Sequence, residues 1–299
     1  MLKRGDVMDL KKILKKKKEL IDEYLKLVLP YCEEPVKLHE AIWYAMFNGG
    51  KRLRAIIMLA IAEMKSQPLE IMLDPAAGIE MIHTSTLLLD DLPSMDDALL
   101  RRGKPALHKV YGEAITILVA QSLLLEGLAL IVTEIISRIS SLEEKLRLCR
   151  KTFSLLGKEG IMVGQFLDLF KSNQELKLKE IEEIHAKKTA SLFEISVDIA
   201  SSLAGFSSQE KKEIMNFATC FGKAFQISDD LIAVENKPAI SGKLSLTKER
   251  RPNYVQVCGK KKTLKSLNDY IQKAIVSLKA LPNSEFLIEL TKYLKTRNN

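Results

Sequence analysis

Apolar residues recur every three to four positions along most of the chain, which is the spacing of one face of an α-helix. The pattern is clear in 143–156, 190–204 and 211–227. Leu, Ile, Met, Lys, Glu and Ala dominate the chain, and all are acceptable helix formers. The sequence contains no Asn-Gly hairpin and no run that alternates with period two. The pattern therefore predicts an all-α protein of roughly ten or more helices, given the usual helix length.

The breaks between these stretches are short. Turn-forming residues stand at 48–50, 74–75, 103–105, 205 and 235–242, and no long Pro-, Gly- or Ser-rich linker divides the chain. We therefore expect a single domain over residues 1–299, a helical bundle that opens with a basic helix at about residues 1–28. The most apolar stretch, 114–132, is interrupted by Gln121 and Glu126, so we expect a buried core helix there and no transmembrane segment.

Net charge first suggests a nucleic-acid partner, since the chain carries +8. The ends hold this charge, with +6 in residues 1–18 and +9 in residues 241–299, which leaves −7 for the acidic middle. A basic groove built by the core of the fold is therefore not expected, and no nucleic acid is predicted as a partner. Solvated helix faces account for the basic ends, with a weak contact to an anionic membrane as the alternative for the N-terminal helix.

The four cysteines, Cys32, Cys149, Cys220 and Cys258, are scattered without pair spacing. No CxxC motif or Cys/His cluster is present, so neither a zinc site nor a disulfide framework is expected. The first ten residues contain Lys and Asp and do not resemble a signal peptide. These features predict buried thiols and a cytoplasmic location.

The strongest chemical signal is the acidic run Asp90-Asp91-Leu-Pro-Ser-Met-Asp96-Asp97, which follows the apolar segment 82–89. Four carboxylates at the end of a buried helix repel each other, so a cation is expected to compensate them. Oxygen ligands favour Mg²⁺, which commonly takes a few carboxylates plus substrate phosphate oxygens. In an unbroken helix Asp90 and Asp96 would lie about 240° apart. The helix should therefore bulge or end here, and Pro93 is well placed to force this.

Two cationic clusters accompany the acidic run. Arg101-Arg102-Gly103-Lys104-Pro105 begins four residues after Asp97, and paired arginines beside a metal-binding run suit a polyphosphate clamp as well as simple salt bridges. The segment 49–54 reads Gly-Gly-Lys-Arg-Leu-Arg. It is not a P-loop, but its glycines allow close backbone approach. We expect Lys51 and Arg54 to share one helix face there and to bind an anion.

A third cluster, Phe225-Gln226-Ile-Ser-Asp229-Asp230, ends another apolar helical run. Gln226 and Asp230 are separated by four residues and should face the same way. Alone, this aspartate pair is weak evidence for a metal, and the first acidic run gives it weight.

Taken together, these motifs resemble the trans-prenyltransferases, the polyprenyl diphosphate synthases that include farnesyl and geranylgeranyl diphosphate synthases. The motifs occur in that family's order from about residue 39 to 243. They are GGKRLR at 49–54, the acidic run with RRGKP at 90–105, GQFLDL at 164–169, KT at 188–189 and FQISDD at 225–230. The two extra residues in the first acidic run resemble the bacterial and plant short-chain type.

The resemblance implies an all-α homodimer with an isoprenoid synthase-like bundle around a central cavity, and two or three Mg²⁺ ions as cofactors. It implies that Asp90 and Asp96 bind Mg²⁺, with Asp91 and Asp97 nearby, and that Asp229 binds a third ion. It also assigns two diphosphate sites. The isopentenyl diphosphate site comprises Gly50, Lys51, Arg54, His83 and Arg102. The allylic diphosphate site comprises Arg101, Lys188, Thr189, Gln226 and Lys243. The residues expected to carry catalysis are Asp90, Asp91, Asp96, Arg101, Lys188 and Asp229.

The implied reaction condenses isopentenyl diphosphate with dimethylallyl, geranyl or farnesyl diphosphate and releases pyrophosphate. Small residues Ser85 and Thr86 precede the first acidic run, where farnesyl-forming relatives often carry an aromatic floor. A deeper pocket and a geranylgeranyl product are therefore favoured over farnesyl.

Departures from the family's pattern keep two alternatives open. The second motif is usually DDxxD, and its third position here is Ala233; the following GKxxGxD-like segment, 242–248, is shortened. One alternative is a non-catalytic prenyltransferase-like regulatory subunit. The other is a terpene cyclase of related fold, against which the low aromatic content and the second cation cluster argue.

Overall fold

The computed structural model describes residues 9–29, 35–171, 176–235, 244–245 and 253–296, with no side-chain detail for residues 235, 244 and 245. It is mostly helical, as the sequence predicts. The helices are α1 (Leu10–Val28), α2 (Val36–Phe47), α3 (Leu53–Met64), α4 (Glu70–Asp90), α5 (Leu107–Tyr111), α6 (Glu113–Arg138), α7 (Leu142–Leu156), α8 (Ile161–Phe170), α9 (Leu178–His185), the π-helical turn η1 (Ala186–Ala190), α10 (Ser191–Leu203), α11 (Ser208–Glu235), α13 (Tyr254–Lys279) and α14 (Glu285–Thr296).

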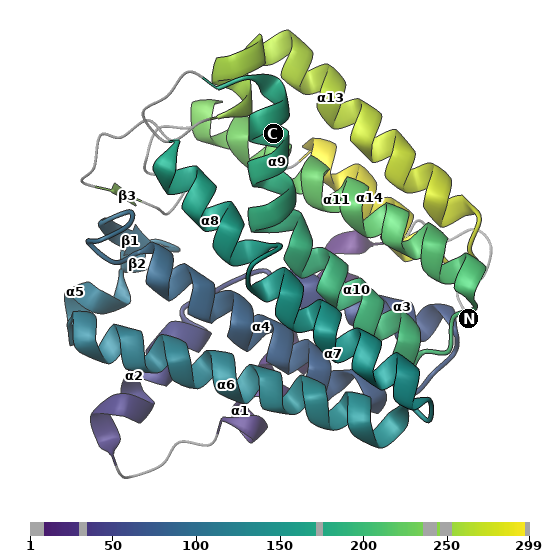
Figure 1. Ribbon diagram of the computed structural model, residues 1–299, viewed down its shortest axis with the longest axis horizontal. Coiled ribbons are helices and arrows are strands. Elements are labelled where there is room, and N and C mark those ends of the chain that lie inside the picture. The colour runs from purple at the N-terminus through teal and green to yellow at the C-terminus, as the bar shows by residue number, and fades with distance from the viewer. Residues whose placement is uncertain (1–8, 30–34, 172–175, 236–243, 246–252, 297–299) are drawn as a thin grey trace.

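One apolar core joins residues of helices from α1 to α14. Helices α3 and α10 lie at its centre, and nearly all of their side chains are buried. Figure 1 shows α6 running alongside α4, and α10 lying close to α11. Burial of these apolar faces provides the main driving force for the bundle.

A pair of glycines brings α4 and α6 into close contact. A Cβ added at Gly78 would lie 2.5 Å from the carbonyl oxygen of Gly127, and one added at Gly127 would lie 2.6 Å from that of Gly78. The two backbones therefore touch, and no larger residue fits at either position. This contact fixes the distance between α6 and the helix that carries the first acidic run.

Gly127→Ala should destabilise the fold by about 1–3 kcal/mol, because the new methyl group forces the two backbones apart. Urea unfolding followed by circular dichroism measures the loss. An unchanged or higher unfolding midpoint would contradict this close contact. Where no clash occurs, replacing a helical glycine by alanine ordinarily stabilises the helix.

Three short strands form a small antiparallel sheet at one end of the bundle (Figure 1). They are β1 (Ala98–Arg101), β2 (Lys104–Pro105) and β3 (Leu244–Ser245), in the order β2-β1-β3. The turn between β1 and β2 contains Arg102 and Gly103, both at positive φ. This hairpin positions the arginine pair. Strands of two to four residues are too short to give an alternating pattern, which explains why the sequence did not predict them.

Two expectations about individual helices need correction. Pro75 does not break the chain but lies inside α4 as its sixth residue, where its missing N–H removes one helical hydrogen bond. Helix α6 is not a buried core helix, since only 33% of its apolar window is buried. Among the helices of the described residues, α6 alone is both long enough and apolar enough to cross a membrane, judged by length and composition. Its outer face exposes Leu118, Leu125 and Ile136.

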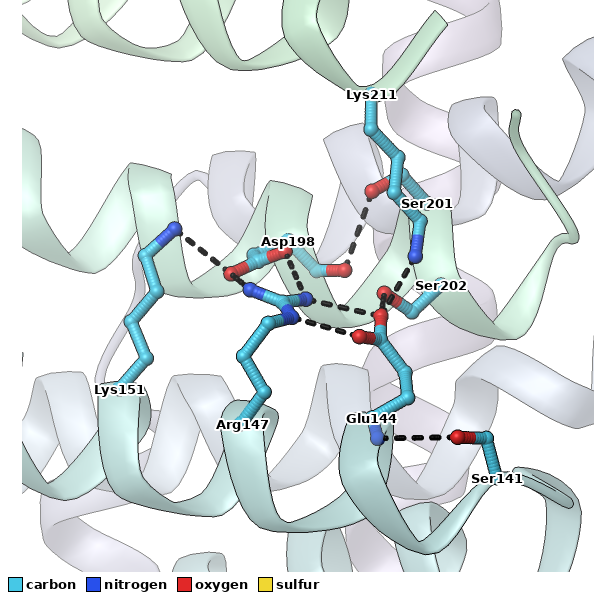
Figure 2. Close-up of polar contacts among 8 residues, drawn as sticks. All are labelled: Ser141, Glu144, Arg147, Lys151, Asp198, Ser201, Ser202 and Lys211. Carbon is cyan, nitrogen blue, oxygen red and sulfur yellow. Dashed lines mark hydrogen bonds and ion pairs between the residues drawn. The ribbon is translucent and has the colours of Figure 1, made fainter. Parts of the chain in front are cut away.

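A network of charged side chains ties α7 to α10 and α11 (Figure 2). Arg147 on α7 donates through both Nη atoms to Asp198 on α10, at 2.8 and 2.9 Å, and also binds Glu144 at 2.7 Å. Lys151 reaches Asp198 at 2.7 Å, and Lys211 on α11 reaches Glu144 at 2.6 Å. Asp198 is buried, so these cations are what allows it to remain charged.

This network should make the fold sensitive to acid. Burial opposes ionisation of Asp198, but the hydrogen bonds from Arg147 and the charge of Lys151 outweigh it and hold the pKa below its ordinary value. Hydrogen bonds from Arg147 likewise lower the pKa of Glu144. A depressed folded-state pKa gives stability that is present above about pH 4 and lost as the pH falls through the folded pKa.

Asp198→Asn should therefore lower the melting temperature at pH 7 by an amount that corresponds to about 1–3 kcal/mol. It should also flatten the decline in melting temperature between about pH 5 and pH 2, because the variant has lost a carboxylate that the wild type must protonate. Scanning calorimetry across this range measures both effects. Parallel curves for the two proteins would show that Asp198 does not carry the acid sensitivity.

Candidate active site

The first acidic run begins where α4 ends. The helix ends at Asp90, and residues 91–97 form a turn that returns to it, because the Asp96 N–H donates to the Asp90 carbonyl at 3.0 Å. Asp97 completes the turn in the left-handed conformation, φ 42°. The helix end predicted at Pro93 is confirmed, and it brings Asp96 back beside Asp90.

The four carboxylates of this run take different directions. Asp90 lines a cavity of about 340 Å³. Asp91 is buried and held at both oxygens by Arg101, with Nε 2.8 Å from Oδ2. Asp97 turns toward α5, where Lys109 lies 3.0 Å away and His108 3.8 Å away. Asp96 is buried and is not part of the cavity lining. The structure thus places Asp90 at the cavity and gives Asp91 the task of orienting Arg101.

Lys188 faces Asp90 from η1. Its Nζ lies 3.6 Å from Asp90 Oδ2 and 2.7 Å from Asp168 Oδ2 on α8. Burial alone would lower the pKa of Lys188, but the two carboxylates raise it, so the ammonium remains charged. Asp168 belongs to the GQFLDL motif, whose sequence alone does not indicate this contact with Lys188.

Two glycines hold η1 in place. A Cβ at Gly164 on α8 would lie 2.3 Å from the Lys188 nitrogen, and one at Gly222 on α11 would lie 2.7 Å from Ala190 Cα. Both helices therefore touch the backbone of this π-helical turn, a geometry that is frequent at functional sites. The turn presents Lys188 and Thr189 to the cavity.

A second cavity of about 540 Å³ contains the cations of the 49–54 segment. Its lining includes Gly50, Lys51, Arg54, His83 and Arg102. These are the residues assigned to the isopentenyl diphosphate site, so the structure brings that predicted set together. Such a concentration of positive charge suits a polyanion.

The glycine pair shapes this cavity through Arg102. Gly49 and Gly50 adopt φ of +99° and +116°, which L side chains rarely adopt. Arg102 Nη1 donates to the Gly49 carbonyl at 2.6 Å, and a Cβ at Gly50 would lie 2.9 Å from the Arg102 guanidinium carbon. The guanidinium therefore packs flat against a bare backbone.

Burial lowers the pKa of two further groups in this cavity, Arg54 and His83. Arg54 stacks over Phe193 at 4.4 Å, and burial lowers its pKa to about 10, so it is still charged at pH 7. Burial, followed by the charges of Arg54 and Arg102, lowers the pKa of His83 well below its ordinary value. His83 is therefore neutral and can donate one hydrogen bond to a phosphate oxygen.

One expectation about this segment is wrong. Helix α3 begins only at Leu53, with Arg52 before it in the left-handed conformation, so Lys51 and Arg54 do not share a helix face. Arg52 is buried and binds Asp22 of α1 at 2.8 Å and Glu80 of α4 at 3.6 Å. It links three helices, a structural role that local sequence could not show.

The second acidic pair lies across from the first. Asp229 lines both cavities, whereas Asp230 lines neither. Gln226 donates to Asp230 at 3.0 Å, which confirms that these two residues face the same way, and accepts from the Thr189 hydroxyl at 2.7 Å. Burial raises the pKa of Asp230 to about 7, although hydrogen bonds from Tyr254 and Gln226 oppose the change.

The two cavities adjoin and share part of their walls. Both are lined by Arg54, His83, Arg101, Arg102, Phe225 and Asp229. The smaller one continues over apolar side chains, among them Leu87, Leu89, Ile161 and Leu192. The two cavities thus share three arginines, while Lys188 lines the smaller cavity alone and Lys51 the larger one alone. The smaller cavity also has the apolar extension.

The chemistry of the site fits Mg²⁺. Asp90 and Asp229 offer carboxylate oxygens to one cavity that also contains Arg101 and Lys188. Within the part of the chain that the structure describes, no three His, Cys, Asp or Glu side chains form a cluster that could hold a metal by themselves. Two carboxylates leave room for waters and for the phosphate oxygens of a substrate, which is how Mg²⁺ usually binds. The metal ligands Asp90, Asp96 and Asp229 stay a prediction.

Two further sequence predictions concern Lys243 and the small residues Ser85 and Thr86. Lys243, expected to bind the allylic diphosphate, lies outside the described residues. Thr86 lines the smaller cavity, but Ser85 is buried outside its lining, on the same helix face as Gly78 and Ile82, which contact α6. The pocket-depth argument therefore applies to Thr86 and not to Ser85.

Comparison with known proteins agrees with this geometry. The polyprenyl synthetase family model matches residues 35–271. The farnesyl diphosphate synthase of Geobacillus stearothermophilus is 36% identical over 236 residues, 79% of each chain. Geranylgeranyl pyrophosphate synthase 4 of Arabidopsis thaliana is 32% identical over 310 residues, covering 99% of this chain and 80% of the relative.

Solved structures give the same result. The apo structure of an FPP/GFPP synthase from Zymomonas mobilis superposes with a TM-score of 0.84 at 27% identity, covering 95% of this chain and 98% of the other. A geranyltransferase from Legionella pneumophila gives 0.85 at 26% identity, with 97% and 98% covered. The chain therefore belongs to the polyprenyl synthetase family of prenyltransferases, whose similar members include farnesyl and geranylgeranyl diphosphate synthases.

Proposed function

We propose that this chain is a Mg²⁺-dependent synthase that condenses isopentenyl diphosphate with an allylic diphosphate and favours geranylgeranyl diphosphate as product. One observation carries the proposal: two adjoining cavities, one lined by Lys188 and the other by Lys51, share a wall that includes Phe225 and Asp229. Two diphosphates can therefore bind with their hydrocarbon parts close together. The cavity that has the apolar extension would take the allylic substrate.

The side chains of the smaller cavity suit ionisation of an allylic C–O bond. As this bond breaks, negative charge develops on the departing diphosphate, and Lys188 and Arg101 are placed to donate hydrogen bonds to it. Asp90 and Asp229 would hold Mg²⁺, which supplies further charge stabilisation when bound. The isopentenyl double bond then attacks C1 of the allylic cation. The departed diphosphate is the expected proton acceptor, because the nearby His83 is better placed to bind phosphate.

Thr86 supports a long product. Its small side chain lines the cavity one turn before Asp90, where an aromatic residue would block chain growth. Substitution of Thr86 by Phe should therefore shorten the product.

A homodimer is proposed from the outer face of α6. The exposed side chains there include Ile117 at 39%, Leu118 at 51% and Leu125 at 67%. Several large apolar side chains exposed on one helix are typical of a protein interface. Cys149, Cys220 and Cys258 are free thiols, but they are half-buried and not fully buried as predicted. Their free state supports the predicted cytoplasmic location.

Incubation of the purified chain with labelled isopentenyl diphosphate, Mg²⁺ and each allylic diphosphate tests the proposal. Mass analysis should identify a C20 diphosphate and stoichiometric pyrophosphate. A C15 product would correct the chain length alone. Hydrocarbon in the organic phase would identify a cyclase instead.

A regulatory subunit without activity is the second candidate, favoured by Ala233. This residue is exposed on the wall of the larger cavity, at the position of the family's third aspartate. A chain that binds isopentenyl diphosphate by calorimetry but forms no product alone would support this candidate.

A further inference from the structure

The two aspartates of the second acidic pair occupy different environments. Asp229 lines both cavities of the site. Asp230, the next residue on α11, is 7% exposed and belongs to the lining of neither. Adjacent residues of a helix point about 100° apart, so one carboxylate can reach the substrates while the other points into the protein.

Both carboxylate oxygens of Asp230 are occupied by protein donors. Oδ1 accepts from Gln226 Nε2 at 3.0 Å, and Oδ2 accepts from the Tyr254 backbone N–H at 2.8 Å. His185 Nε2 lies 3.4 Å from Oδ2, and the Asp230 carbonyl accepts from Asn253 Nδ2 at 3.2 Å. These groups come from α11, from the end of α9 and from the beginning of α13. They leave the carboxylate poorly placed to take a cation as well.

The bond to Asp230 determines how Gln226 is oriented. A side-chain amide has one donor end and one acceptor end, and the network decides which points where. Because the Asp230 oxygen attracts the NH₂ group, the Gln226 carbonyl is directed to the Thr189 hydroxyl, which donates to it at 2.7 Å. Gln226 and Thr189 line the smaller cavity together with Lys188.

On its other side Asp230 is connected to the C-terminal helices. The Tyr254 ring stacks on His185 with 6.0 Å between centroids, and its hydroxyl donates to Glu182 of α9 at 3.0 Å. Tyr270 of α13 donates to the same glutamate oxygen at 3.2 Å. Asp230 is therefore the junction between the wall of the substrate cavity and the start of α13.

We propose that Asp230 is a positioning residue and not a metal ligand: it fixes the orientation of Gln226, and through it Thr189, for the allylic diphosphate, and it ties α13 to α11. This inference rests on the proposed function. It assigns distinct tasks to the two aspartates of one motif, with Asp229 alone facing the substrates.

An Asp→Asn substitution at position 230 and the same substitution at position 229 distinguish positioning of the substrate from binding of the metal. Asp230→Asn keeps the side-chain volume but places an NH₂ group where an acceptor stood, so the KM for the allylic diphosphate should rise about 3- to 10-fold. The Mg²⁺ concentration for half-maximal rate should stay at the wild-type value. Asp229→Asn, the matched control, should raise that concentration. A readout other than turnover is Mg²⁺ binding in the presence of inorganic pyrophosphate, measured by calorimetry, which Asp230→Asn should leave unchanged.

Gln226→Met gives an independent route to the same conclusion, including the case in which Asp230→Asn does not fold. It should raise the KM for the allylic diphosphate with no change in the Mg²⁺ requirement. In the double variant the two effects should be non-additive, because Asp230 acts through Gln226. A raised Mg²⁺ requirement in Asp230→Asn, or KM effects that multiply in the double variant, would overturn the inference. A wild-type chain that forms no product would refute the proposed function instead.

Discussion

Asp90→Asn should lower kcat/KM for the allylic diphosphate on the order of 10²–10³-fold, the usual cost of removing one preorganised electrostatic contact. The side chain ends α4 at the wall of the smaller cavity, with Lys188 Nζ 3.6 Å from Oδ2. Asparagine has the same size but no charge, so it would bind Mg²⁺ weakly. It would also leave Lys188 with Asp168 as its carboxylate partner. Steady-state kinetics over a series of Mg²⁺ concentrations measures the loss, and excess Mg²⁺ should restore part of it.

Asp97→Asn is the matched control for this variant. Asp97 belongs to the same acidic run, but its carboxylate pairs with Lys109 on the far side of the turn. Asparagine also tolerates the left-handed backbone found there, φ 42°. The control should keep most of the wild-type activity. Equal losses of kcat/KM in both variants would mean that the acidic run acts through its total negative charge. Asp90 would then not be a specific ligand of the metal.

The sequence was informative where the chemistry is local. The carboxylates of the first run and the helix end at Pro93 depend on neighbours within eight residues, so spacing and proline geometry sufficed to predict the turn. The i, i+4 relation of Gln226 and Asp230 follows from helix geometry alone and is present in the structure.

The sequence was less informative where a residue's partner is distant in the chain. Nothing near Asp91 shows that Arg101 occupies both of its oxygens, because that contact needs the β1–β2 hairpin. Arg52 stands between Lys51 and Arg54 in the cationic segment, yet it is buried against Asp22 and Glu80, which belong to two other helices. Asp168 stood in a noted motif, but only the fold brings it to Lys188.

The different partners of the two neighbouring arginines are also a tertiary property. Arg101 and Arg102 are adjacent in sequence, and the left-handed Arg102 turns its guanidinium to the Gly49 backbone while Arg101 turns to Asp91. Periodicity arguments assume regular elements and fail at such residues. Positive φ values at Gly49 and Gly50 mark the same place, where the backbone is shaped by the site and not by helix propensity.

Gly164→Ala should reduce kcat about 10²-fold, because the methyl group would lie 2.3 Å from the Lys188 nitrogen and 2.7 Å from its Cα. Both neighbours are backbone atoms, so η1 must move away from α8. Lys188 would then lose its placement between Asp168 and Asp90, at 2.7 and 3.6 Å. The fold should also lose about 1–3 kcal/mol of stability, as overpacking generally costs. Kinetics at a temperature well below the melting point separate the two effects.

Gly127→Ala provides the stability-matched control, since its methyl group also meets a backbone oxygen, at 2.6 Å, but on the α4–α6 contact. Both variants should unfold at lower urea concentrations than the wild type, and only Gly164→Ala should lose most of its kcat. Equal loss of kcat in the two would mean that general loosening of the bundle, and not the position of Lys188, limits turnover. Normal kcat in Gly164→Ala would mean that η1 can shift without harm, so that the close backbone contact serves packing alone.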